Sequence, residues 1–191
     1  MSMIVPIKSS EIVLRQLDDK IDVSAFDCGV DDLNGYLKEN ALNDYKNKMS
    51  VTYVLLYAQR VIAYYSILTD RVDTKVDPIR RSLRDRLKRK IDYQYTSMPA
   101  MKIGRLAVDK DYQNANHCDI HLGELIISGL KYQYAVNPAF GCRLLTVDAM
   151  NCDQTLRFYE KNGFIRMIAE KIENKEATIP MFFDLASMVK K

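Results

Sequence analysis

The sequence contains neither a long apolar run nor a pair of closely spaced cysteines. Its best apolar candidate, residues 53–68, is split by Gln59 and Arg60, and this interruption excludes a membrane-spanning helix. The four cysteines form no CxxC pair, a pattern typical of reduced, mostly buried thiols and not of a disulfide scaffold. Because the N-terminal residues also lack a charged segment followed by an apolar run, we expect a cytoplasmic protein without a secretory signal.

Histidine is scarce as well, since the chain has only two, His117 and His121. They lie four residues apart with Cys118 and Asp119 between them, so a metal site has to be considered. Zinc takes three or four ligands, however, and no other ligands converge by spacing. We therefore expect no metal.

Charge is present in both signs but is unevenly distributed. The net charge is +3 over 191 residues, yet seven cations and one carboxylate fall between residues 80 and 90. This segment carries +6 and leaves −3 for the rest of the chain. Apolar residues recur there every four positions, from Ile79 to Ile91, which predicts an inserted basic helix over 78–92 with an apolar stripe beneath its cations.

The length and a hydrophobic content of 48% favour a single domain, residues 1–191. Runs of β-branched and aromatic residues predict strands, and apolar residues at three- and four-residue steps predict helices. We expect strands at 12–17, 52–58, 61–68, 101–108, 143–149, 164–169 and 179–185, and helices from Val30 and at 122–134 and 152–162. This order predicts an α/β (α+β) fold with a mixed sheet of about six to seven strands, containing a right-handed strand–helix–strand crossover.

Two of these regions have a more detailed prediction. Gln59 and Arg60 separate the strands 52–58 and 61–68, which indicates an antiparallel hairpin. In the helix that begins near Val30, one apolar face is expected to pack on the sheet. Its members are Leu33, Tyr36, Leu37, Ala41 and Tyr45.

The most informative stretch is residues 144–164, which read LLTVDAMNCDQTLRFYEKNGF. Together with the order of elements over nearly the whole chain, it resembles the GNAT superfamily of acetyl-CoA-dependent N-acetyltransferases. The resemblance implies the GNAT fold and places Asn151 and Phe158 beside the cofactor and Tyr159 at the thioester. A phenol with a pKa near 10 is protonated at neutral pH and can donate to a departing thiolate, so Tyr159 is the candidate general acid.

A structural interpretation of the same helix stays open. Cys152, Leu156 and Tyr159 recur at four- and three-residue steps and could form an ordinary buried face. Neither Cys152 nor Cys118 has an evident histidine partner, so direct transfer without an acyl-enzyme is the simpler mechanism.

The second feature of the resemblance is the strand that ends at Val108 and the loop after it. In the family, backbone groups of such a strand lie along the pantetheine arm, and amides at a helix N-terminus hold the pyrophosphate. The chain departs from the family pattern here, because Gly123 is the only glycine in the loop after Gln113. The implied cofactor-binding residues are Leu106, Ala107, Val108, Gln113, Asn114, His121, Leu122, Gly123 and Glu124, with Asn151 and Phe158.

Three further segments resemble a GNAT subgroup of toxins that acetylate aminoacyl-tRNA. They read FDCGVDDLNGYLKENA (26–41), YYSILTDRV (64–72) and PAMKIGRLAVDKDYQ (99–113). This resemblance implies acetyl-CoA, a tRNA and a small antitoxin protein as partners. The cations that would contact tRNA phosphates are Arg80, Arg81, Arg84, Lys88 and Arg89.

Alternatives to this function also stay open. A cationic helix face is often simply solvated, its arginines paired with nearby aspartates. The acceptor could then be a small molecule, a peptide or a protein lysine, and a module that binds acyl-CoA without transfer is a third interpretation. The oligomeric state is not determined by the sequence, and a homodimer remains open.

Overall fold

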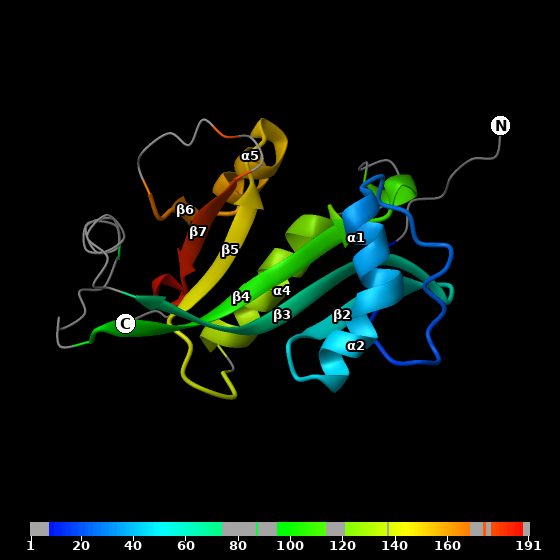
Figure 1. The fold of residues 1–191 in the computed structure, drawn as a ribbon, viewed down its shortest axis with the longest axis horizontal. Helices are drawn as coiled ribbons and strands as arrows, with labels where there is room; N and C mark the ends of the chain where they lie inside the picture. The colour runs from blue at the N-terminus through cyan, green and yellow to red at the C-terminus, as the bar shows by residue number, and fades with distance from the viewer. Residues whose placement is uncertain are drawn as a thin grey trace. The chain divides into compact units, whose positions relative to one another are not determined.

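The computed structural model describes residues 8–73, 87, 95–113, 121–136, 138–168, 174 and 177–188. Its strands are β1 (Val13–Gln16), β2 (Val51–Tyr57), β3 (Arg60–Asp73), β4 (Ser97–Val108), β5 (Leu144–Met150), β6 (Ile165–Arg166) and β7 (Thr178–Asp184). They form one mixed sheet in the order β1-β2-β3-β4-β5-β7-β6 (Figure 1). The helices are α1 (Asp31–Gly35), α2 (Ala41–Lys46), α4 (Leu122–Val136) and α5 (Asp153–Lys161), with a π-helical turn η2 (Tyr36–Asn40) and short 3-10 turns η1 (Ser9–Glu11), η3 (Lys110–Tyr112) and η4 (Leu185–Ser187).

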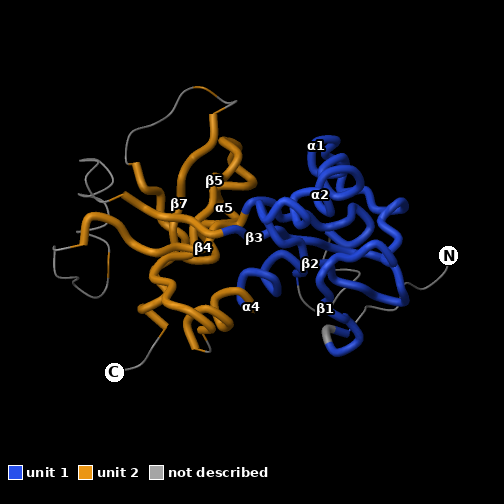
Figure 2. Tube along the Cα trace, turned by 60° about the horizontal axis from the view of Figure 1, so that its bottom comes forward, with its two compact units in different colours: residues 1–68, 104–128 blue, residues 69–103, 129–191 orange. Residues whose placement is uncertain are grey.

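The chain forms two compact units (Figure 2). The first contains residues 1–68 and 104–128, and the second contains residues 69–103 and 129–191. Strands β3 and β4 and helix α4 each contribute residues to both units. The single-domain assignment made from the sequence remains a prediction.

The first unit contains the predicted hairpin. β1 and β2 pair antiparallel, and β2 pairs antiparallel with β3 from Val51↔Ile67 to Tyr57↔Arg60. The turn is formed by Ala58 and Gln59, both with positive φ (46° and 67°), as in the tight turns that match the twist of paired strands. The hairpin is therefore confirmed, although its turn lies one residue earlier than predicted and β3 continues to Asp73.

The helix predicted from Val30 begins at Asp31, directly after Val30 as its N-cap. Tyr36, Leu37 and Ala41 are buried in the core of this unit together with Tyr64 and Phe26, which confirms the apolar face. The prediction for Tyr45 is wrong, because its side chain is 39% exposed. Tyr45 lies in the last turn of α2, which ends at Lys46.

The paired residues of the predicted strand–helix–strand connection lie in the second unit. β4 pairs parallel with β5 from Ala100↔Leu144 to Ile103↔Val147, and α4 lies between the two strands in the sequence. β5 then pairs antiparallel with β7, and β7 with β6. Leu144 and Phe182, both fully buried, lie in a core cluster on these strands.

The remaining expectations agree in part with the structure. β6 covers Ile165–Arg166 of the strand predicted over 164–169, of which residue 169 lies outside the described residues. The N–H of Met167 continues the register of β6 and β7 by donating to the carbonyl of Pro180 at 2.8 Å. The basic helix predicted over 78–92 lies outside the described residues, apart from Leu87, which packs half-buried against the Leu144–Phe182 cluster. None of the described helices has the length and apolar character needed to cross a membrane.

Candidate functional site

The C-terminal end of α5 explains why the sequence reads FYEKNGF. Gly163 follows the C-cap Asn162 with φ +76°, a left-handed conformation that glycine adopts without a steric cost. The N–H of Gly163 donates to the carbonyl of Glu160 (2.8 Å), and the N–H of Phe164 donates to the carbonyl of Tyr159 (3.0 Å). This pair of bonds is a Schellman motif, and the contact between Phe164 and Tyr159 is the apolar contact that accompanies it.

Tyr159 lies in an aromatic cluster that this motif creates. Its ring centroid is 5.0 Å from that of Phe158 and 5.3 Å from that of Phe164, in both cases edge to face. Phe164 in turn contacts Phe183 of β7 at 5.9 Å. The rings therefore determine where the Tyr159 phenol lies, with its side chain only 6% exposed.

The chemistry of this phenol follows from its burial. Desolvation raises the pKa of Tyr159 well above its ordinary value, so the group is neutral and protonated at physiological pH. Its hydroxyl makes no hydrogen bond to another described residue. A buried phenol with an unused O–H is suited to donate a proton to a newly formed anion.

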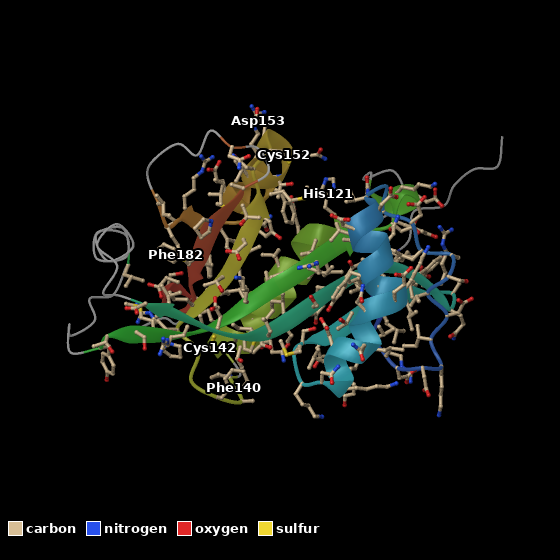
Figure 3. The ribbon with its side chains drawn as sticks, in the orientation of Figure 1. His121, Phe140, Cys142, Cys152, Asp153 and Phe182 are labelled. Atoms are coloured by element: carbon tan, nitrogen blue, oxygen red, sulfur yellow. The ribbon has the colours of Figure 1, made fainter. Side chains whose placement is uncertain are left out.

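The two interpretations of α5 are both supported in part. Leu156 and Tyr159 are buried, as the structural interpretation predicts, whereas Cys152 is exposed and donates from Sγ to Oγ1 of Thr155 at 3.2 Å. Figure 3 shows Cys152 and Asp153 at the start of α5. Burial of the Tyr159 ring does not conflict with a catalytic role, because the ring packs while the hydroxyl has no described hydrogen-bond partner.

Phe158 and Asn151, the other residues predicted on this side, have different surroundings. Phe158 is half-buried beside Tyr159 on α5. Asn151 lies between β5 and α5, and its Nδ2 donates to the carbonyl of Asn174 at 2.9 Å. Its side chain thus holds a later segment of the chain.

The three residues of β4 predicted to follow the pantetheine arm have alternating burial. Ala107 is buried and belongs to the core of the first unit, while Leu106 and Val108 are half-buried. Gln113 uses its side chain within the protein: its Nε2 donates to the carbonyls of Cys28 and Val108, both at 2.9 Å. Gln113 therefore contributes to fixing the end of β4.

The start of α4 contains four of the predicted cofactor-binding residues. His121 precedes the helix and is exposed, and Leu122, Gly123 and Glu124 form its first turn. The carbonyl of His121 accepts the first intrahelical bond, from Leu125 at 3.0 Å. The N–H groups of this first turn have no intrahelical acceptor, which is the arrangement that binds phosphates. Asn114 lies outside the described residues.

A buried carboxylate at the end of β4 was missed by the sequence analysis. Asp109 is fully buried and accepts from Nη2 of Arg60 (3.1 Å) and from the backbone N–H groups of Asp27 (3.2 Å) and Asp111 (3.1 Å). Lys110 in addition pairs with Asp27 at 2.7 Å. These contacts fix the chain directly after Leu106–Val108. The one signal in the sequence for a carboxylate that fixes the chain here is the position of Asp109 directly after a predicted strand.

Arg105 was also not predicted as a functional residue. It is exposed on β4, and its guanidinium lies 5.1 Å from the ring centroid of Tyr36 in the π-helical turn η2. The hydroxyl of Tyr36 is held by Ser50 at 2.9 Å. Stacking of this kind pre-orients a guanidinium, and Nη1 of Arg105 also donates to the carbonyl of Gly104 at 2.8 Å.

Carboxylates that could accept the proton of an attacking amine already have partners. Asp148 of β5 pairs with Lys102 of β4, and Glu160 of α5 pairs with Arg166 at 2.8 Å. Glu124 also has an interaction within the protein. No group of three or more His, Cys, Asp or Glu side chains suited to a metal ion occurs in the part of the chain that the structure describes.

The cations predicted to contact RNA fall outside the described residues. These are Arg80, Arg81, Arg84, Lys88 and Arg89.

Comparison with known proteins finds similar solved structures but no matching family model. Compared with models of protein families, the sequence matches none. Among solved structures, a Tyr-to-Phe mutant of KacT has a TM-score of 0.71 at 23% identity, covering 93% of this chain and 96% of that one. AtaT complexed with acetyl-methionyl-tRNAfMet has a TM-score of 0.70 at 23% identity, with the same coverage. AtaTR bound with acetyl-CoA has a TM-score of 0.67 at 24% identity, again covering 93% and 96%.

These similarities extend over nearly the whole chain and agree with the observed strand order. AtaT is also known as a toxin in complex with the C-terminus of the antitoxin AtaR, in line with the subgroup that the sequence resembles. The sequence predicted an α+β fold with a mixed sheet of about six to seven strands, and the observed mixed sheet of seven strands confirms this prediction. The chain has the fold of KacT and AtaT.

Proposed function

We propose that this protein is an N-acetyltransferase that moves an acetyl group from acetyl-CoA to a primary amine. The observation that carries the proposal is Tyr159, a buried, protonated phenol with an unused O–H at the end of the helix that follows β5. The shared fold supports it, since AtaT has been solved with acetyl-CoA and with an acetylated methionyl-tRNA.

The reaction is a direct transfer. The amine nitrogen attacks the thioester carbonyl carbon, the new C–N bond forms, and the C–S bond breaks. The thiolate takes the proton of the Tyr159 hydroxyl, and the amine loses one proton to water, from which the phenolate is reprotonated. The products are an N-acetylated amine and free CoA thiol, so no oxidant or further reactant is required.

Two features would hold acetyl-CoA. The first turn of α4, at Leu122, Gly123 and Glu124, suits the pyrophosphate, because a helix N-terminus presents N–H groups without intrahelical acceptors and the positive end of the helix dipole. Backbone groups of Leu106, Ala107 and Val108 suit the extended pantetheine arm. The Arg60–Asp109 pair and Gln113 keep the end of that strand in place.

Replacing Tyr159 tests the catalytic part of the proposal. Tyr159→Phe should lower kcat by about 10²- to 10⁴-fold, the usual effect of a general acid, while the Kd for acetyl-CoA changes little. Steady-state kinetics and calorimetric titration with acetyl-CoA measure the two quantities. Tyr132→Phe, at a tyrosine of α4 that is 61% exposed, is the matched control and should change neither.

Two outcomes would contradict this proposal. An unchanged kcat in Tyr159→Phe would remove this residue from the mechanism. If labelled acetyl-CoA incubated with a whole-cell extract and this protein transferred no label to RNA, protein or small amines, a module that binds acyl-CoA without transfer would be the better interpretation.

We further propose that the acceptor is the amino group of an aminoacyl-tRNA. The three segments that resemble tRNA-acetylating toxins and the cationic segment 80–90 support this acceptor over a small amine. By the same reasoning, a small antitoxin-like protein is the proposed partner, as AtaR is for AtaT.

The tRNA proposal is tested by removing charge. Changing Arg84, Lys88 and Arg89 to Gln should weaken tRNA binding and reduce the slope of log Kd against log salt by up to about 3, roughly one for each phosphate that is no longer neutralised. The control changes Arg15, Lys20 and Lys46, exposed cations of the first unit, to Gln. Equal salt slopes in both triple variants would show that the 80–90 segment makes no specific contact with RNA.

A further inference from the structure

A half-buried lysine of α4 contacts the C-terminal end of α5. Nζ of Lys131 donates a hydrogen bond to the carbonyl of Asn162, the C-cap of α5. The same ammonium lies 4.0 Å from the ring centroid of Phe183 and 5.6 Å from that of Phe164. A single cation therefore touches the cap of the helix and two rings of the cluster that surrounds Tyr159.

Packing alone does not account for a lysine at this position. Burial removes water from the ammonium and lowers its pKa, and no carboxylate of a described residue pairs with it. An apolar side chain of similar length would fill the same space without that desolvation cost. What the ammonium contributes is directional: it binds a carbonyl at the negative end of a helix dipole and two aromatic faces.

Lys131 is connected to Tyr159 in two ways, through the end of α5 and through the Phe164 ring. Asn162 ends the helix turn in which the carbonyl of Tyr159 accepts from Phe164, and the Phe164 ring packs on the Tyr159 ring at 5.3 Å. Because no described residue bonds to the Tyr159 hydroxyl, the position of the phenol depends on its ring contacts and on the end of α5. Lys131 contacts the C-cap of α5 and one of the two rings that pack on Tyr159, that of Phe164.

We propose that Lys131 is a positioning residue for Tyr159, holding the C-terminal turn of α5 and the Phe164 ring so that the phenol is placed for proton donation. The inference rests on the proposed function, since it assigns Lys131 a role through the general acid. Lys131 itself does not touch the reacting atoms in this scheme. Its contribution is to the geometry of the transition state and not to binding of acetyl-CoA.

The experiment is a double-variant cycle on kcat. Lys131→Met keeps the length and apolar stem of the side chain but removes the charge, and should lower kcat about 10-fold with less than about a twofold change in KM for acetyl-CoA. In the Tyr159→Phe background the same change should lower kcat by less than about twofold, because residues that act as a unit are not additive. Lys131→Arg, which keeps the cation, should retain at least about half of the kcat.

The matched control is Lys161→Met, which removes one charge from an exposed lysine in the last turn of α5. It should leave kcat within about twofold, which separates the specific contact of Lys131 from a general effect of charge near this helix end. Thermal denaturation of each variant identifies any that does not fold, in which case Lys131→Gln takes the place of Lys131→Met.

Several outcomes would overturn the inference. Equal reductions of kcat from Lys131→Met in both backgrounds would show that Lys131 acts independently of Tyr159. An unchanged kcat with lower thermal stability would show a purely structural role. Failure of the proposed function would be detected separately, by an unchanged kcat in Tyr159→Phe alone. In that case Tyr159 would not be the general acid, and the role proposed for Lys131 would fail as well.

Discussion

Replacing Gly163 tests whether the Schellman motif holds the candidate general acid. Its φ of +76° disfavours any side chain with a Cβ, and a Cβ added here would lie 3.3 Å from Cε2 of Phe183, tighter than most such contacts. The left-handed conformation costs about 1 to 2 kcal/mol for alanine, offset by about 0.5 kcal/mol because alanine restricts the unfolded chain. Displacing the Phe183 ring, which lies under Lys131, adds up to about 1 kcal/mol.

Gly163→Ala should therefore lower the free energy of unfolding by about 0.5 to 2.5 kcal/mol, measured by urea denaturation, or the melting temperature by about 1 to 10 °C. Variants at two other glycines distinguish the cost of the left-handed backbone from the cost of the contact with Phe183. Gly29 has φ +81° with no atom within 4 Å of an added Cβ, so Gly29→Ala shows the backbone cost alone, about 1 kcal/mol. Gly129 lies exposed inside α4 with neither constraint, and Gly129→Ala should raise stability by about 0.5 to 1 kcal/mol.

These costs require that the free energy of unfolding be lowest for Gly163→Ala, higher for Gly29→Ala and highest for Gly129→Ala. If Gly163→Ala were as stable as the unmodified protein, the observed cap would not be required to end α5. If Gly163→Ala and Gly29→Ala were destabilised equally, the contact with Phe183 would contribute nothing. Gly163→Asn should recover part of the stability, because asparagine adopts the left-handed conformation more easily than alanine.

Two predictions concern buried ionisable groups. Arg60→Gln should lower the free energy of unfolding by about 1 to 3 kcal/mol, because it leaves the fully buried Asp109 without its cation. Lys110→Gln breaks an exposed ion pair and should lower it clearly less; equal effects of the two variants in urea denaturation would refute the difference. Burial raises the pKa of both Tyr64 and Tyr159, so the stability they contribute is fully present below pH ~10 and is lost as pH rises above it. The tyrosinate absorbance of these two residues should therefore rise only as the protein unfolds. The double variant Tyr64→Phe/Tyr159→Phe should unfold at a higher alkaline pH than the unmodified protein. Ionisation of all tyrosines before unfolding would contradict this prediction.

Local elements could be predicted because their causes lie close together in the sequence. Gly163 and the apolar steps of 152–162 predict where α5 ends, and the structure places its last residue at Lys161. The turn between β2 and β3 was placed within one residue by its polar pair. The π-helical turn η2 could not be predicted, because Leu33, Tyr36, Leu37 and Ala41 recur at the three- and four-residue steps that also describe an α-helix.

Among the residues of the candidate site, the surroundings of Tyr159 were determined by the sequence itself: the segment FYEKNGF (158–164) contains the helix end, the glycine and both rings that pack on the predicted general acid. Only the tertiary structure decided which groups support it. Lys131 reaches a carbonyl 31 residues away, and Asp109 pairs with Arg60 49 residues away and with the backbone of Asp27 82 residues away. Such contacts leave no periodic pattern in a sequence, because burial of a charge is decided by segments that meet only when the sheet has formed.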